Sequence, residues 1–276
     1  MESRLQTPAR ALAAIALLLL ACNAAADTLR IGGTGSALGT MRLLAEEFRK
    51  THPQVEIEVL PSLGSPGGIR AVLAGAIEVG VAARALKPEE EAAGARQVPA
   101  GLTPFVFAVG ASSKVAALSS AELVEIYAGR RLHWSDGSPV RLVLRTPSGA
   151  EIDLLYAISP QMKEAHMLAE KRPGLLTTAT DQENADALEE IPGALGVITL
   201  AQVLSEKRAL RVLQIDGVAP SPVTLRQGSY RPFVPLYLVT GPQATPAARQ
   251  FVAFVRSAAG AAVLTRTGYL PSSDGR

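Results

Sequence analysis

Strand-like and helix-like segments alternate along the chain after residue 27, and this order restricts the fold more than any other feature of the sequence. Apolar runs typical of strands lie at 28–31, 55–60, 78–83, 105–110, 140–145, 193–200 and 234–240. Segments with helical spacing lie at 38–50, 68–76, 119–129, 181–191 and 245–264, the last a helical pair broken near Gly260. Such alternation predicts an α/β fold with largely parallel sheets.

The length and composition restrict the domain count and the partners. A chain of 276 residues is longer than one typical core requires, so we expect two lobes. Aromatic residues make up 4% of the chain, the net charge is +2 and no basic run stands out. These values argue against a nucleic-acid partner, which would need a basic surface or aromatic residues for base stacking.

Residues 1–26 are typical of an export signal, because basic residues precede an apolar stretch at 11–21 that is too short to span a bilayer. Two processing routes stay open. Cleavage at the A-x-A site at 24–26 would leave the mature chain as 27–276, and we favour this route. A lipobox-like Leu-Leu-Ala-Cys run would instead place a lipid on Cys22, the only cysteine, so neither route leaves an internal disulfide.

A glycine-rich loop, IGGTGSALGT at 31–40, joins the first strand to the first helix. Free backbone N–H groups and the positive end of the helix dipole make such a loop an anion site. The loop lacks the lysine of a Walker A motif, and Leu38 stands where a dinucleotide fingerprint needs a small residue, so a nucleotide is disfavoured. A small oxyanion beside Ser36 remains, as does a ligand-free turn in which Ser36 caps the helix.

Three later loops repeat the arrangement, since each leads into a helix and carries a hydroxyl side chain. They are LGSPGGI at 63–69 with Ser65, RTPSGAEI at 145–152 with Arg145, Ser148 and Gly149, and ATDQEN at 179–184 with Thr180 as the candidate N-cap. Helix starts that follow parallel strands meet at one edge of a sheet. Their hydroxyls, with an arginine for charge, could converge on a small anion with several oxygens.

The sequence contains no motif that predicts catalysis or metal binding. The three histidines, His52, His133 and His166, are scattered, and no cysteine cluster or H-x-x-x-H spacing predicts zinc. No G-x-S-x-G elbow is present, and no acid–base pair stands out. We therefore expect neither an enzyme nor a cofactor.

The order of these segments resembles the phosphate-binding periplasmic proteins of ABC transporters, a type II periplasmic binding protein family. The run at 33–90 carries the first part of the likeness. It contains the family's glycine-hydroxyl loop with a helix ending in Phe48, then LGSPGGI as the second loop, and then the run that includes Ala83 and Arg84. Further likeness lies in IYAGRRLHWSDGSPVRLVLRTPSGA at 126–150, PGALGVITL at 192–200, GSYRPFVPLYLVT at 228–240 and AGAAVLTRTGYLP at 259–271. The resemblance covers essentially all of the mature chain.

The resemblance implies a two-lobe fold in which each lobe is a mainly parallel sheet flanked by helices and the ligand lies in the cleft between lobes. One lobe would comprise 27–102 and 241–276, and the other 103–240. The ligand-binding residues expected from the resemblance and the loops are Ser36, Ala37, Ser65, Gly67, Arg84, Arg145, Ser148, Gly149, Ala150 and Thr180. Hydroxyls and helix-start N–H groups would donate to the ligand, and the arginines would supply positive charge.

The chain departs from the family's pattern at several positions. Ala83 replaces a family serine, Ala150 replaces the threonine of a Ser-Gly-Thr motif, and no aspartate is evident where the family accepts a proton from hydrogen phosphate. A site without that acceptor loses a reason to prefer a protonated oxyanion. An anion is therefore better supported than phosphate in particular.

The resulting prediction is an exported, periplasmic and monomeric protein that captures phosphate or a similar oxyanion. Its partners would be ABC permease subunits in the inner membrane, with no nucleic acid and no cofactor. A lipid anchor depends on the processing of Cys22. The alternative is a periplasmic anion-sensing module that serves a signalling partner without transport.

Overall fold

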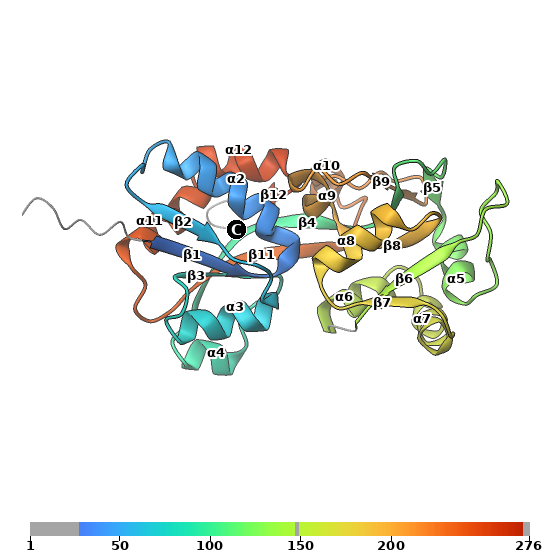
Figure 1. Ribbon diagram of the computed structural model, residues 1–276, viewed down its shortest axis with the longest axis horizontal. Coiled ribbons are helices and arrows are strands. Elements are labelled where there is room, and N and C mark those ends of the chain that lie inside the picture. Colours follow the sequence, from blue (N-terminus) through green and yellow to red (C-terminus); the bar gives the residue numbers. More distant parts are fainter. Residues whose placement is uncertain (1–27, 147–148, 273–276) are drawn as a thin grey trace, which may run out of the picture.

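The structure, a computed structural model, describes residues 28–146 and 149–272 (Figure 1). The expected signal segment 1–26, with Cys22, and the predicted ligand residue Ser148 lie outside the described residues. Within the described ranges, no helix has the length and apolar character needed to cross a bilayer.

The strands and helices follow the alternation expected from the sequence. The strands are β1 (Thr28–Gly33), β2 (Glu56–Val59), β3 (Val79–Ala82), β4 (Arg96–Gly110), β5 (Ala117–Leu118), β6 (Arg141–Arg145), β7 (Leu176–Thr178), β8 (Ala194–Thr199), β9 (Leu210–Val212), β10 (Gln214–Ile215), β11 (Phe233–Thr240) and β12 (Leu270–Pro271). The helices are the short 3-10 turn η1 (Gly35–Ala37), α2 (Leu38–Arg49), α3 (Gly64–Leu73), α4 (Pro88–Ala92), α5 (Ser120–Tyr127), α6 (Gly149–Tyr156), α7 (Met162–Lys171), α8 (Asp181–Glu190), α9 (Leu200–Ser205), α10 (Pro222–Gln227), α11 (Pro246–Val255) and α12 (Ala258–Arg266).

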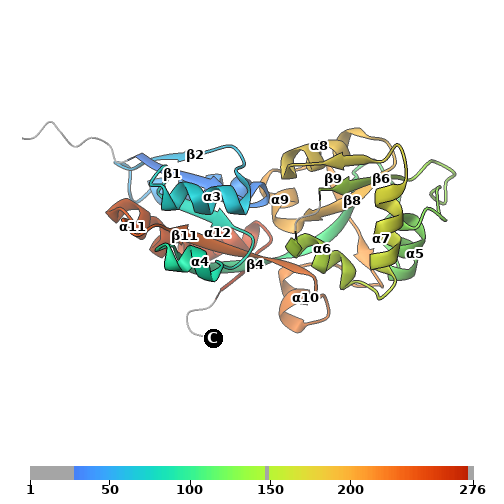
Figure 2. The ribbon, with the colours of Figure 1, turned by 90° about the horizontal axis from the view of Figure 1, so that it is seen from below.

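The main sheet is mixed, with strand order β2-β1-β3-β11-β4-β8-β6-β7. The expected parallel pairs lie towards its two ends, where β1 pairs with β2 and β3, and β6 pairs with β7 and β8. The long strand β4 and its partner β11 run antiparallel to their neighbours and join these two parallel parts. β4 and β11 therefore run between the two lobes of the α/β fold (Figure 2).

Each lobe has its own apolar core, and β4 contributes to both of them. Ala100, near the start of β4, packs in a cluster with α2, α11 and α12, whereas Phe105 and Phe107 pack in a second cluster with α5 and α7. The helical spacing of Met41, Leu44 and Phe48 predicts their burial in the first core, which the structure confirms. The residue boundaries expected for the lobes stay a prediction.

The helical pair near the C-terminus breaks earlier than the sequence predicts. The chain leaves α11 at Arg256, and α12 starts after Ser257, whose hydroxyl accepts the N–H of Gly260 at 3.3 Å. Gly260 thus lies in the first turn of α12 rather than at the break. A side chain there would meet the carbonyl oxygen of Phe254 at 2.3 Å, so glycine permits the close turn between the helices.

Candidate functional site

The glycine-rich loop after β1 forms η1 and presents its backbone towards the second lobe. Gly33 has a φ of 155°, and the N–H of Thr34 donates to the carbonyl of Val81 in β3 at 2.9 Å. Ser36 is buried, and its hydroxyl lies 3.2 Å from the hydroxyl of Thr34. The side chain of Ser36 makes no capping hydrogen bond to η1 or α2, so the interpretation of this residue as a simple helix cap is wrong.

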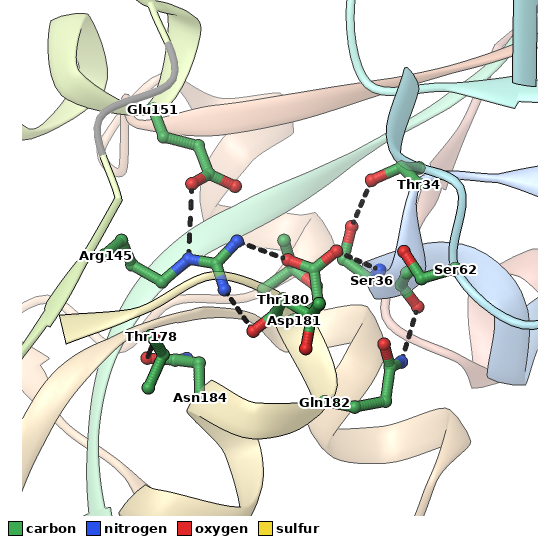
Figure 3. Close-up of polar contacts among 12 residues, drawn as sticks. Thr34, Ser36, Ser62, Arg145, Glu151, Thr178, Thr180, Asp181, Gln182 and Asn184 are labelled. Carbon is green, nitrogen blue, oxygen red and sulfur yellow. Dashed lines mark hydrogen bonds and ion pairs between the residues drawn. The ribbon is translucent and has the colours of Figure 1, made fainter. Parts of the chain in front are cut away.

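The backbone N–H of Ser36 donates to the carboxylate of Asp181, at the start of α8, over 2.9 Å (Figure 3). Beside this contact, the amide of Gln182 donates to the carbonyl of Gly35 at 3.1 Å. A side chain at position 35 would lie 2.6 to 2.9 Å from the side chains of Gln182, Asp181 and Ser62. Gly35 therefore leaves the space that the ends of these three side chains occupy.

Arg145 ends β6 and directs its guanidinium to the same carboxylate. One terminal nitrogen donates to Asp181 at 3.0 Å, the other donates to the carbonyl of Thr180, and Nε lies 3.6 Å from the carboxylate of Glu151 (Figure 3). Only 14% of the Arg145 side chain is exposed. When all are ionised, this one guanidinium and its two carboxylates carry a net negative charge, so the cluster offers an incoming anion little excess positive charge.

The start of α8 is fixed by a capping box. The Thr180 hydroxyl accepts the N–H of Glu183 at 3.1 Å, while the Glu183 carboxylate accepts the N–H of Thr180 at 3.2 Å. The prediction of Thr180 as the N-cap is confirmed. Its hydroxyl is engaged by its own helix, and its carbonyl, rather than its hydroxyl, contacts Arg145.

Other predicted ligand residues contact different partners. The Ser65 hydroxyl accepts the N–H of Ala83 at 2.9 Å, which ties α3 to the end of β3. The guanidinium of Arg84 donates twice to Glu90, at 2.8 and 2.7 Å, and these bonds lower the pKa of Glu90 to about 2. Asp181 and Arg145 thus bring Ser36, Arg145 and Thr180 together, whereas Ser65 and Arg84 bond to Ala83 and Glu90.

The remaining predicted residues lie at helix starts. Ala37 is buried and donates its N–H to the carbonyl of Thr34 at 3.4 Å, and Gly67 lies in the first turn of α3. Gly149 and Ala150 begin α6, the helix that follows Arg145. The backbone positions therefore agree with the expected loop-to-helix arrangement, while the contact of these residues with a ligand stays a prediction.

Sequence reasoning missed Asp181 and Gln182 as cleft residues. Acidic residues in the first turn of a helix usually favour the helix dipole, which by itself explains an aspartate at position 181. The one available signal was the position of Asp181 directly after the candidate cap Thr180, in a loop already expected to face the cleft. The partner, Ser36, lies 145 residues away in the sequence, so no local pattern could identify it.

A groove of about 900 Å³ lies beside the start of α8, where Ser62, Thr180 and Gln182 line it. Its other walls include Arg42 from α2 and Lys207 after α9. Among the residues that the structure describes, no three His, Cys, Asp or Glu side chains are grouped to hold a metal ion.

Comparison with known proteins identifies relatives of this chain. Over 106 residues it is 32% identical to phosphate-binding protein PstS 2 of Streptococcus pneumoniae, an alignment that covers 38% of this chain and 36% of the relative. The alignment thus spans little more than a third of that relative's length.

Solved structures share the fold over most of the chain. A Clostridium perfringens protein, described as a phosphate ABC transporter substrate-binding protein and solved with bound phosphate, has a TM-score of 0.73 at 23% identity, covering 90% of this chain and all of that one. An ABC-type phosphate transport receptor from Vibrio cholerae has a TM-score of 0.57 at 18% identity, covering 88% of this chain and 99% of the receptor. At these identities the likeness shows the two-lobe fold.

A profile of the PBP superfamily domain matches residues 21–259. The match includes the glycine loop, the end of β6 with Arg145 and the start of α8, so it contains the whole cluster between the lobes. Because it spans most of the chain, the protein belongs to the PBP superfamily.

Proposed function

We propose that this protein is an exported solute-binding protein that captures phosphate or a similar oxyanion between its lobes for an ABC-type importer. One observation carries the proposal: a carboxylate, that of Asp181, is held jointly by the Ser36 N–H and by Arg145. Two oxygens of a carboxylate resemble two oxygens of phosphate or sulfate in charge and spacing. Donors that hold one are therefore suited to hold the other.

The ligand contacts that we propose begin with Arg145 as the charged group and the N–H groups near Ser36 and Ala37 as neutral donors. The N–H groups of Gly149 and Ala150, at the start of α6, add donors beside the arginine. By resemblance, the further ligands are Ser65, Gly67 and Ser148. We assign Arg84 to a structural pair with Glu90, because both of its terminal nitrogens are engaged there.

The choice of phosphate rests on the relatives. The Streptococcus pneumoniae relative is named for phosphate binding, and the Clostridium perfringens structure contains phosphate. These names favour transport over the sensing alternative. The same proposal includes a periplasmic location, permease partners, a monomeric state and the lack of catalysis. Both processing routes, cleavage at 24–26 and a lipid on Cys22, are compatible with it.

Isothermal titration of the purified exported protein with phosphate, sulfate and molybdate tests the proposal. We expect saturable binding of one equivalent of at least one oxyanion, with phosphate bound most tightly. Folded protein that binds none of the three would refute the proposal. A mass measurement of the mature chain from its native host decides between cleavage at 24–26 and lipidation.

A further inference from the structure

The Asp181 carboxylate uses both of its oxygens to join the two lobes. Oδ2 accepts the N–H of Ser36, which lies in the 3-10 turn η1 before α2 in one lobe, and Oδ1 accepts a guanidinium N–H of Arg145, which ends β6 in the other. Only 15% of the Asp181 side chain is exposed. The carboxylate thus occupies the place where a charged arginine and a helix-start N–H converge, which is the place proposed for the oxyanion (Figure 3).

Neighbouring contacts hold Asp181 in this position. The buried amide of Gln202, in α9, donates to the backbone carbonyl of Asp181 at 3.2 Å. Gln182 donates across the cleft to the carbonyl of Gly35 at 3.1 Å. The missing side chain at Gly35 leaves the space that both α8 side chains fill. The approach of α8 to η1 is therefore specific, with matched donors, acceptors and shape on both sides.

The charges make this contact and a bound oxyanion mutually exclusive. Arg145 already faces the carboxylates of Asp181 and Glu151. A phosphate or sulfate on the same donors would place further negative charge within a few ångströms of Asp181, and like charges at that distance repel strongly in a partly buried site. The anion would also need the Ser36 N–H, which has only one hydrogen to donate.

We propose that Asp181 is an internal ligand of the anion site, which closes the cleft in the absence of solute and must be displaced before an oxyanion binds. The identity of the competing solute rests on the proposed function, whereas the closing contact does not. Breaking the contact costs free energy, and this cost lowers the apparent affinity of the protein for the oxyanion, because only the fraction of molecules with Asp181 displaced can bind it. Asp181 thereby sets how much oxyanion is needed to load the protein.

The test compares three variants of the full exported protein. Asp181→Asn removes the charge and keeps the size of the side chain, and Gly35→Ala places a methyl group against Asp181 and Gln182 without changing any charge. Glu190→Gln is the matched control, because it removes one exposed carboxylate from the last turn of the same helix. Circular dichroism and thermal melts establish that each variant is folded.

Two readouts are measured: the radius of gyration without anion, by X-ray scattering, and the dissociation constant for inorganic phosphate, by calorimetry. We expect Asp181→Asn and Gly35→Ala to be more extended than the native protein, and Glu190→Gln to match it. Phosphate should make Asp181→Asn compact again and bind it roughly tenfold more tightly, or more, than it binds the native protein.

The outcomes separate this inference from the proposed function. If Asp181→Asn stays as compact as the native protein and binds phosphate equally well, the internal ligand is refuted and the proposed function stands. Weaker phosphate binding with new binding of sulfate would also refute it, because Asp181 would then accept a proton from the anion. If the variants extend but no oxyanion binds to any of the proteins, the closing contact is supported and the proposed function fails.

Discussion

Arg145 and Asp181 form an ion pair at 3.0 Å that joins the end of β6 to the start of α8, with about 15% of each side chain exposed. The same guanidinium is the proposed charged ligand, so removing it should affect both binding and stability. We expect Arg145→Gln to weaken oxyanion binding roughly 100-fold, since the loss of a buried charged partner costs a few kcal/mol. Calorimetric titration with phosphate measures the loss.

Arg141→Gln is the control for this prediction, because Arg141 lies on the same strand with its side chain exposed. It removes the same charge and should leave the dissociation constant unchanged. Arg145→Gln should also lower the free energy of unfolding by about 1–3 kcal/mol, because Asp181 and Glu151 lose their shared cation. Equal phosphate affinity in the two variants would contradict the role of Arg145.

The elements that the sequence predicts well are those with a local pattern. The burial of Met41, Leu44 and Phe48 follows from helical spacing, and the start of α8 follows from the capping box at Thr180. The first half of β4 was not predicted, because Pro99, Gly101 and Pro104 interrupt the apolar run of a strand. Pairing with β11 and β12 stabilises this extended segment, and that information lies more than a hundred residues away.

The candidate site shows the same division between local and distant information. Glycines, hydroxyls and helix starts mark the loops around Ser36 and Arg145, so the sequence predicts that these loops bind an anion. Which side chain fills the space between them depends on how the lobes meet. The position of the Asp181 side chain depends on Gly35, whose missing side chain leaves room for it, and on Gln202, which donates to the Asp181 backbone carbonyl. Neither contact produces a periodic pattern or a motif in the sequence.

The Arg84–Glu90 pair predicts a defined dependence of stability on pH. The folded pKa of Glu90, about 2, lies below its ordinary value of 4.5, so the pair stabilises the fold above pH 4.5 and this stabilisation is lost as the pH falls towards 2. At pH 7, Glu90→Gln should lower the free energy of unfolding by about 1–2 kcal/mol, less than the full shift implies because solvent partly screens the pair.

Urea denaturation at pH 7, 4 and 3 checks this dependence. The difference between the native protein and Glu90→Gln should shrink at the two lower pH values, while phosphate affinity at pH 7 stays unchanged. Glu91→Gln, an exposed neighbour in the same helix, should show little effect at any pH. A difference that grows on acidification would contradict the assignment, as would a loss of phosphate binding.

His166 gives a second pH dependence. The imidazole in α7 is 3% exposed, and burial lowers its pKa below 6.5, although Glu170 at 3.9 Å acts in the opposite direction. Because the unfolded chain then binds a proton more readily than the folded one, stability should fall as the pH drops below 6.5. The His166 ring packs against the rings of Tyr127 and Tyr156, so a phenylalanine is a suitable apolar replacement. His166→Phe should lose the part of the pH dependence of stability that His166 causes.

Denaturation between pH 7.5 and 5.5 measures that slope. The comparison uses the change with pH rather than the absolute stability, because the larger phenylalanine ring also alters packing. His133→Gln, with an exposed side chain, should retain the native slope. The same slope in all three proteins would show that groups other than His166 dominate the titration.

Gly33 ends β1 and leads into the glycine-rich loop with Ser36, in a backbone conformation that a residue with a side chain could not adopt there. Its φ is 155°, and a Cβ there would lie 1.9 Å from the carbonyl oxygen of Val81. That oxygen accepts the N–H of Thr34, so the contact fixes the turn that positions Ser36. We expect Gly33→Ala to lower the free energy of unfolding by about 3 kcal/mol or more, since strand β3 cannot yield without breaking the sheet.

Gly137→Ala is the matched control for this prediction. Gly137 also has a positive φ, 82°, but a Cβ there meets nothing within 4 Å, so the substitution should cost only the conformational strain of about 1–2 kcal/mol. Urea denaturation compares the two variants. Any folded Gly33→Ala protein should also bind phosphate more weakly than Gly137→Ala does, because the displaced turn moves the Ser36 N–H. Equal stability and equal affinity in the two variants would show that the loop tolerates a side chain and that its geometry does not depend on the β1–β3 contact.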